Sequence, residues 1–204
     1  MIPSRFPRSR YALFLLTALA FLFLDLASKS WAFQHCGLPG TQEEWWVIPN
    51  VLGIQTSLNE GALFGMGQGF SFLFCGVSVL ALAFFWGWLF GLGKAESRFW
   101  TFVLGMMGGG VLGNTFDRLG LHGLTWDWAF IPWLNGNPIH EAGEPVYAVR
   151  DWILVMLGSY HWPNFNLADS CMVVGISLIL LDAFFHPEVA AGEAKKTPES
   201  PEQP

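Results

Sequence analysis

Two short segments of the sequence each place an asparagine and an aspartate three positions apart. They read NTFD from Asn114 and NLAD from Asn166. Because residues i and i+3 lie on one face of an α-helix, each segment would present a carboxylate beside an amide. Two close carboxylates cannot both ionise easily, so one keeps a proton and the pair can act as base and acid toward one water molecule. Asp117 and Asp169 are therefore a candidate catalytic pair.

Other interpretations of the polar residues stay open. The two carboxylates also suit a buried ion pair or two solvated acids at a membrane interface. Asp25 and Lys29 are spaced i, i+4, which is typical of an intrahelical pair that neutralises itself. Asn59 stands in a turn-like stretch where asparagine is common, so by itself it indicates no function.

Histidines in the second half of the chain raise the question of a metal site. They are His122, His140 and His161, and Glu141 follows the second of them. Their spacing matches no established ligand set such as HExxH. An outer loop rich in Trp and His is more often interfacial, so the sequence predicts no metal.

The composition excludes several classes of protein. Hydrophobic residues make up 52% of the chain and charged residues 13%, about half of the usual ~25% charged. The ten Lys and Arg face sixteen Asp and Glu, so the basic stripe of a nucleic-acid-binding protein is missing. Such hydrophobicity also excludes a disordered chain and indicates a membrane protein.

Four apolar runs are long enough to cross a bilayer. They cover residues 11–33, 70–93, 99–119 and 166–185. The first could instead be a cleavable signal peptide, with a basic start and a small pair at Ala27-Ser28, although Asp25 just before the cut is atypical. We expect an all-α membrane protein with four transmembrane helices, a small extended, β-like element at the outer face and an interfacial insertion.

A row of glycines indicates close helix packing. Gly105, Gly109 and Gly113 recur every four residues, and Asp117 continues the same row. Small residues at this spacing let another helix approach closely. If the third and fourth helices pack side by side, Asp117 and Asp169 would meet at a similar depth.

The distribution of positive charge predicts the orientation, because short cytoplasmic loops carry the excess of Lys and Arg. These residues gather at the N-terminus, between the second and third runs and in the tail: Arg5, Arg8, Arg10, Lys94, Arg98, Lys195 and Lys196. Both termini should be cytoplasmic, with residues 34–69 and 120–165 on the outer side. Within the former, residues 45–64 suggest short extended pieces at the outer interface. Residues 187–204 are polar and Pro-rich and are expected to form a disordered cytoplasmic tail.

Five ordered motifs together resemble those of signal peptidase II, the bacterial prolipoprotein signal peptidase. They are DxxxK from Asp25 to Lys29, NxGxxF from Asn59 to Phe64, GNxxDR from Gly113 to Arg118, VxDW from Val149 to Trp152 and FNxAD from Phe165 to Asp169. The motifs lie in one order along residues 25–169, so the resemblance covers most of the chain. It implies a single membrane-embedded peptidase domain over residues 1–186.

The resemblance also implies an activity and a set of functional residues. An enzyme of this family is an intramembrane aspartic endopeptidase of the bacterial inner membrane, with its site near the outer face. It removes the signal peptide of a diacylglyceryl-modified prolipoprotein before the lipidated cysteine, among membrane lipids and without a cofactor or an obligate protein partner. The catalytic aspartates would be Asp117 and Asp169. The other functional positions would be Asp25, Lys29, Asn59, Gly61, Asn114, Arg118, Asp151, Asn166 and Ala168.

The sequence departs from the family pattern in two places. The connection between Asp117 and Asp169 is much longer than usual, with extra sequence at about residues 124–148, for which we hypothesise an outer-face flap or lid over the substrate groove. Around the NxGxxF motif, this chain has Leu63 where the family usually has a small residue and Ser57 where it usually has an apolar one. A non-enzymatic membrane protein, either a small transporter subunit or an inactive relative that binds lipidated peptides, is the alternative.

Overall fold

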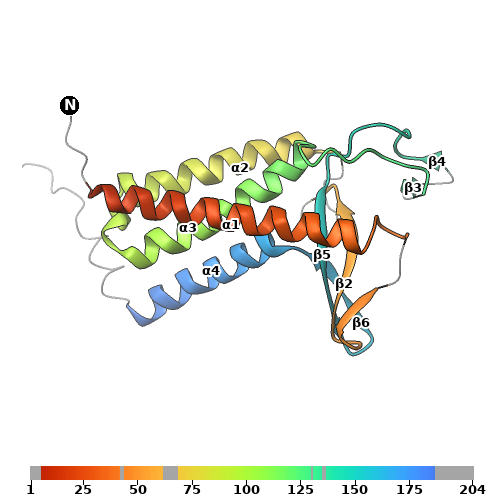
Figure 1. The fold of residues 1–204 in the computed structure, drawn as a ribbon. Helices are drawn as coiled ribbons and strands as arrows, with labels where there is room; N and C mark the ends of the chain where they lie inside the picture. The colour runs from red at the N-terminus through yellow and green to blue at the C-terminus, as the bar shows by residue number, and fades with distance from the viewer. Residues whose placement is uncertain (1–5, 42–43, 62–68, 130, 135–136, 187–204) are drawn as a thin grey trace, which may run out of the picture.

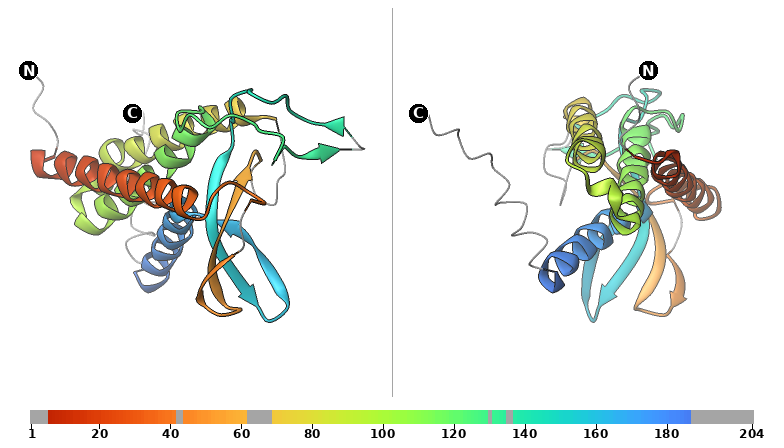
Figure 2. Two further views of the ribbon diagram at one scale, coloured as in Figure 1. Left: turned by 45° about the vertical axis from the view of Figure 1, so that its right-hand side comes forward. Right: turned by 90° about the vertical axis from the view of Figure 1, so that its left-hand side faces the viewer.

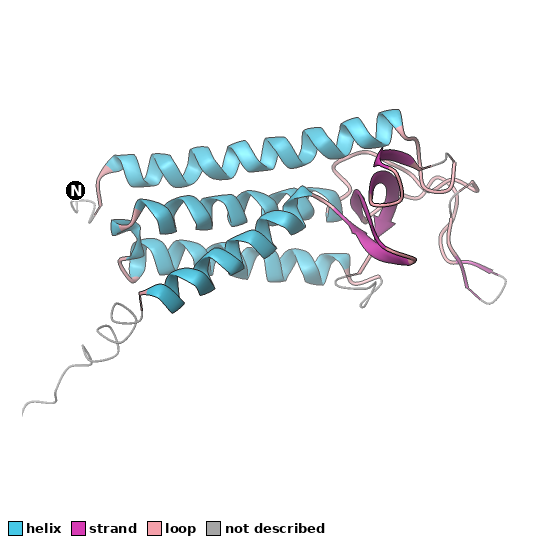
Figure 3. Ribbon diagram, turned by 90° about the horizontal axis from the view of Figure 1, so that it is seen from below, coloured by secondary structure: helices cyan, strands magenta, loops and turns pink. Residues whose placement is uncertain are grey.

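The structure is a computed structural model that describes residues 6–41, 44–61, 69–129, 131–134 and 137–186. Long helices lie roughly side by side, and a small antiparallel sheet stands at one end of them (Figures 1 and 3). The expected tail at residues 187–204, and Leu63 and Phe64 of the NxGxxF loop, lie outside the described residues.

Each of the four apolar runs contains one long helix. These are α1 (Arg8–His35), α2 (Ser71–Trp86), α3 (Arg98–Arg118) and α4 (Leu167–Phe185). α2 continues as a π-helical turn, η2 (Gly87–Gly91), and a short 3-10 helix, η3 (Lys94–Glu96), leads into α3. Within the described residues, three helical segments are long and apolar enough to span a bilayer: Arg8–His35, Ser71–Gly91 and Leu167–Phe185.

α3 falls outside that group because its glycines and polar residues make it less apolar, and it lies at the centre of the helices. It contacts α1, α2 and α4, and Figure 2 shows it between α1 and α2 in the end-on view. A central helix meets other helices in place of lipid, so it tolerates glycine and polar residues. By contrast, α1, α2 and α4 leave large apolar side chains exposed, including Leu16 (66%), Leu80 (70%) and Phe184 (76%). So much exposed apolar surface is typical of a lipid-facing protein.

The all-α class expected from the sequence is wrong, because the chain also forms a four-stranded antiparallel sheet. Its strands are β1 (Trp45–Ile48), β2 (Leu52–Asn59), β5 (Val149–Leu157) and β6 (Tyr160–Phe165), in the order β1-β2-β5-β6. β1 and β2 account for the extended pieces expected within residues 45–64. β5 and β6 were missed, although Gly158, with φ of 65°, and Ser159 form a two-residue turn between two apolar, aromatic segments.

Glycines on neighbouring faces of α3 lie against two different helices. A side chain at Gly109 would meet the backbone oxygen of Ala18 in α1 at 2.5 Å, and one at Gly105 would meet that of Phe14 at 2.9 Å. Gly110, one position on, lies against α4, where a side chain would meet the Ala168 oxygen at 2.8 Å. The glycine row expected from the sequence is therefore present, and its partner is α1.

The insertion at residues 124–148 forms a long hairpin-like arm that projects from the same end of the molecule as the sheet (Figure 1). It carries the two short paired strands β3 (Trp133–Leu134) and β4 (Asn137–Pro138). Trp126, Ile131, Val146 and Ala148 are buried together, with Leu58 and Leu124 packed against them. The arm therefore has a small core of its own, anchored on β2.

The close packing of the glycine row against α1 predicts how a substitution there changes stability. We expect Gly109→Ala to lower the free energy of unfolding by about 1–3 kcal/mol, because the new methyl group meets backbone atoms that cannot move aside. Gly76→Ala in α2 is the matched control, since nothing lies within 4 Å of a side chain there and alanine stabilises a helix relative to glycine. Unfolding of the purified proteins in detergent measures both; equal stability of the two variants would contradict the packing described here.

Candidate active site

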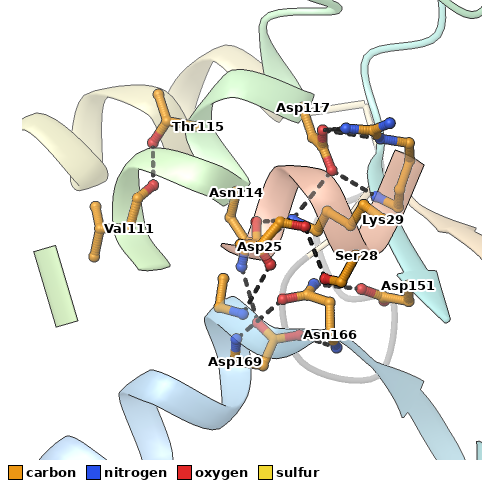
Figure 4. Close-up of polar contacts among 12 residues, drawn as sticks. Asp25, Ser28, Lys29, Val111, Asn114, Thr115, Asp117, Asp151, Asn166 and Asp169 are labelled. Carbon is orange, nitrogen blue, oxygen red and sulfur yellow. Dashed lines mark hydrogen bonds and ion pairs between the residues drawn. The ribbon is translucent and has the colours of Figure 1, made fainter. Parts of the chain in front are cut away.

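The described structure brings all the site residues expected from the sequence together where the helices meet the sheet, and Figure 4 shows the centre of this site, around Asp25, Asn114 and Asn166. They come from α1, the end of β2, α3, β5 and the start of α4, and hydrogen bonds or ion pairs link them into one network. The members are Asp25, Lys29, Asn59, Gly61, Asn114, Asp117, Arg118, Asp151, Asn166, Ala168 and Asp169.

One half of the network is a buried cluster of charges around Asp117. The Lys29 Nζ lies 2.7 Å from Asp25 Oδ2 and 3.2 Å from Asp117 Oδ2. Arg150 donates to Asp117 Oδ1 from Nε at 3.1 Å and from Nη2 at 2.8 Å, and its backbone N–H donates to Oδ2 at 3.0 Å. Asp25, Lys29 and Asp117 are fully buried and Arg150 is 5% exposed. Two carboxylates thus face two cations, and the cluster is formally neutral.

Arg150 is a site residue that the sequence analysis missed. A signal was available, because Arg150 is a charged residue inside an apolar strand, next to Asp151. Successive side chains of a strand point to opposite faces of the sheet. Arg150 therefore contacts Asp117 on one face, while Asp151 takes part in a different set of contacts on the other.

The N-terminus of α4 forms the other half of the network. Asn166 accepts from the Asp169 N–H at 3.0 Å, and Asp169 Oδ2 accepts from the Asn166 N–H at 3.2 Å, which is a capping box. Asn114 joins the two halves: its Oδ1 accepts from Lys29 at 2.8 Å and its Nδ2 donates to Asp169 Oδ1 at 2.9 Å. The Ala168 N–H donates to Asp25 Oδ1 at 2.9 Å, which ties α4 to α1.

Asp151 belongs to the same half as Asp169. Asn166 Nδ2 donates to Asp151 Oδ1 at 2.6 Å, and Asn59 Nδ2 donates to Asp151 Oδ2 at 3.2 Å. Burial, and then the negative charge of Asp169, raise the pKa of Asp151 to about 7, although both amides favour its ionised form. A carboxyl group with such a pKa is about half protonated at pH 7 and holds its proton below that pH.

A cavity of about 990 Å³ opens beside this second half. Asp151, Asp169, Asn114, Asn59 and Arg118 line it, together with apolar residues of β6 and α4. Arg118 Nη2 donates to the Gly61 oxygen at 3.0 Å, and its guanidinium lies 5.1 Å from the centre of the Phe74 ring. Three carboxylates, those of Asp151, Asp169 and Glu60, and one guanidinium thus border the same space.

Asp117 lies outside this cavity. Its exposed fraction is 0%, and it is not among the described residues that line the wall. Figure 4 shows Asp117 on the other side of Lys29 from Asp169. The cause is the helix geometry: Asp117 continues the glycine row that faces α1, whereas Asn114, three positions earlier, faces Asp169 in α4.

The histidines considered as metal ligands lie apart from one another. His140 contacts Glu60, His161 contacts Gln55, and His122 Nδ1 accepts from the Leu124 N–H. Among the described residues, no group of three or more His, Cys, Asp or Glu is arranged to hold a metal ion.

Comparison with known proteins gives the family of the chain. The profile of the family described as "Signal peptidase (SPase) II" matches residues 17–185. A lipoprotein signal peptidase of Rhodopirellula baltica is 42% identical over 193 residues, covering 94% of this chain and 80% of its own. One from Geobacillus thermodenitrificans is 31% identical over 176 residues, covering 86% of this chain and 92% of its own.

A solved structure described as a bacterial membrane enzyme has the same fold. It superposes with a TM-score of 0.63 over 92% of this chain and 94% of its own, at 23% sequence identity. The match to the family profile covers α1 from residue 17 onward, the other three long helices and the four-stranded sheet. Together with the identity to the R. baltica protein, it shows that the chain belongs to the signal peptidase II family.

Proposed function

We propose that the chain is an intramembrane aspartic endopeptidase that removes the signal peptide from diacylglyceryl-modified prolipoproteins, cutting before the lipidated cysteine. Its family, and the name lipoprotein signal peptidase that its relatives carry, support the removal of signal peptides from lipoproteins. The observation that carries the aspartic mechanism is that Asp151 and Asp169 border one cavity and bond to the same residue, Asn166.

The charges around the cavity suit a pair of carboxyl groups that share a proton. Asp151 and Asp169 border the cavity together with the guanidinium of Arg118, while Glu60, the third carboxylate at its wall, contacts His140. One proton on the pair therefore makes Asp151, Asp169 and Arg118 together neutral. In the proposed reaction, the ionised aspartate takes a proton from a water molecule while the protonated one donates to the scissile carbonyl oxygen. A tetrahedral intermediate then forms without a covalent bond to the enzyme, and no cofactor takes part.

We propose a supporting role for Asp117. Its carboxylate accepts from Arg150 and Lys29, and Lys29 in turn holds Asn114 against Asp169. Loss of Asp117 would leave two buried cations with one carboxylate between them. The pair Asp117 and Asp169 expected from the sequence stays a prediction, and the cleavage experiment below tests it beside the pair Asp151 and Asp169.

The walls of the cavity suit an apolar peptide with a lipid anchor. Met172, Val173 and Ile176 of α4 continue the wall beyond Asp169, and Trp162 and Phe165 of β6 form another side. Val173 is 66% exposed, so this wall is continuous with the lipid-facing surface of α4. A signal helix could therefore lie along α4 with its end at the two carboxyl groups.

We further propose a bacterial inner-membrane protein with four spans, in which α3 is the fourth. Arg8, Arg10, Lys94 and Arg98 belong to the ends of α1, η3 and α3 that lie away from the sheet (Figure 1). The excess of positive charge in cytoplasmic loops supports a cytoplasmic position for this end, with both termini there. The sheet and the cavity would then lie at the outer face.

Three isosteric variants test the catalytic pair. We expect Asp151→Asn and Asp169→Asn to fold and to lower cleavage of a diacylglyceryl-modified prolipoprotein by about 10²–10⁴-fold or more, because each removes an acid–base group. Asp117→Asn should instead lower the free energy of unfolding by about 3–5 kcal/mol, because it breaks a buried ion pair. Mobility shift of the substrate and unfolding in detergent give both values.

The double variant Asp117→Asn/Arg150→Gln separates the two candidate pairs, since it removes one buried charge of each sign. Under the proposal it is more stable than Asp117→Asn and recovers part of the cleavage. A stable double variant without activity, beside an active Asp151→Asn, would establish Asp117 in place of Asp151. Full cleavage by all the variants would exclude both pairs, whereas a folded parent protein that cleaves nothing would favour a protein that only binds lipidated peptides.

The raised pKa of Asp151 predicts the pH dependence. Below about pH 7 Asp151 holds the proton that the reaction needs, and above it the proton is lost, so kcat/KM should fall as the pH rises through about 7. Asn59→Leu removes a hydrogen bond that stabilises the ionised form and should move this decline to higher pH. The pH profile reports the apparent pKa values of the pair; a basic limb unmoved by Asn59→Leu would contradict the assignment.

Reporter fusions test the four spans. Green fluorescent protein after the C-terminus should fluoresce, because four spans return the chain to the cytoplasm. Alkaline phosphatase inserted between Gly158 and Ser159, in the β5–β6 turn, should be active on the outer side. Active phosphatase fused after the C-terminus would mean an odd number of spans.

A further inference from the structure

We infer that His140 is a positioning residue, through which the insertion at residues 124–148 holds the loop Asn59–Gly61 against the catalytic site. The inference rests on the proposed function for its effect on cleavage. The contact itself is a feature of the chain alone: His140 Nε2 lies 2.7 Å from Glu60 Oε1.

Backbone hydrogen bonds and burial hold the base of the insertion in place, so it can position the loop Asn59–Gly61. The Trp126 N–H donates to the Glu144 oxygen at 2.8 Å, and the Gly143 N–H donates back to the Trp126 oxygen at 2.8 Å. The Val146 N–H donates to the Leu124 oxygen at 3.0 Å. Trp126 is 4% exposed and Val146 is fully buried. These bonds and this burial fix the part of the insertion that carries His140.

The ring of His140 is held in one orientation. It stacks on the ring of Trp126 with the centroids 4.2 Å apart and an angle of 7° between the planes. Nε2 points to Glu60, and Nδ1 lies 3.9 Å from Glu144 Oε2. The Glu60 side chain is 11% exposed, so the contact is largely shielded from water. A hydrogen bond in such a shielded place is stronger than one in water.

Glu60 is the middle residue of a loop whose two neighbours both reach the site. Asn59 donates to Asp151 Oδ2 at 3.2 Å, and the Gly61 oxygen accepts from Arg118 at 3.0 Å. Glu60 itself lines the 990 Å³ cavity and also a second one of about 270 Å³ against Trp126 and His140. Displacement of Glu60 would therefore move the partners of both Asp151 and Arg118.

The geometry differs from that of a lid. None of the described residues of the insertion lines the 990 Å³ cavity, so the described part of the insertion does not cover it. The insertion instead acts on the cavity indirectly, because His140 contacts Glu60 and Glu60 lines the cavity. Loss of the contact between His140 and Glu60 should therefore disturb the reactive groups and lower kcat. Loss of a lid would instead change the entry of the substrate.

A double-mutant cycle on His140 and Glu60 tests the inference. We expect His140→Ala and Glu60→Ala each to lower kcat by about tenfold, the size of one lost charge-assisted hydrogen bond, with little change in KM. The double variant should be no slower than either single one, because both remove the same contact. Glu60→Gln keeps an acceptor oxygen for His140 and should retain most of the activity.

His161→Ala is the matched control, since His161 also contacts a side chain of β2, Gln55, at 3.1 Å but lies on β6 away from this loop. Hydrogen–deuterium exchange without substrate gives a second readout. Exchange in the peptide that contains residues 58–61 should rise in His140→Ala and stay unchanged in His161→Ala.

Two results would overturn the inference: unchanged exchange at residues 58–61 in His140→Ala, or losses in kcat that add up in the double variant. If the parent protein cleaves no prolipoprotein, the proposed function fails, and the exchange experiment still decides whether His140 holds the loop.

Discussion

The arrangement of the site depends on one constraint, that charges buried away from water must be paired. Lys29 is the clearest case. Its ammonium group is fully buried and meets Asp25, Asp117 and the Asn114 oxygen. These three partners come from α1 and α3, so the ends of the two helices cannot separate without leaving a buried charge unpaired. The glycine row of α3 makes this approach possible.

The pairing of one set of charges determines which acids remain for chemistry. Arg150 and Lys29 together neutralise Asp117 and Asp25. At the wall of the cavity, Glu60 contacts His140, and Asp151 and Asp169 are left with Arg118. A neutral cluster thus lies behind a pair of carboxyl groups that has one proton to share. Asn114 and the Ala168 N–H, which donates to Asp25, join the two parts. In this account Asp117 contributes to the site by holding its supports in place.

The sequence was sufficient to find the members of the site, except for Arg150. Polar residues are costly inside apolar helices, so Asp25, Lys29, Asn114 and Asp117 stood out, and the motifs added the rest. It was not sufficient to pair them. Which helix each face of α3 meets depends on packing around the whole helix. Asn114 and Asp117 both contact Lys29, but only Asn114 also reaches Asp169 in α4.

The sheet was harder to predict for a similar reason. β5 is a nearly continuous apolar segment, whose period does not distinguish a strand from a buried helix. Once β5 is known to be a strand, the opposite directions of Arg150 and Asp151 follow directly. The Gly158-Ser159 turn was the sequence signal that β5 and β6 form a hairpin. The contact between His140 and Glu60 joins segments far apart in the chain, and no local pattern indicates it.

The central claim is that Asp151 and Asp169 share a proton at the cavity, and infrared titration of carboxyl groups in the purified protein tests it most directly. We expect one protonated carboxyl band that disappears as the pH rises through about 7. It should be absent from Asp151→Asn, shifted in pH in Asp169→Asn and unchanged in Asp117→Asn. A band that persists in Asp151→Asn and is lost in Asp117→Asn would contradict the account.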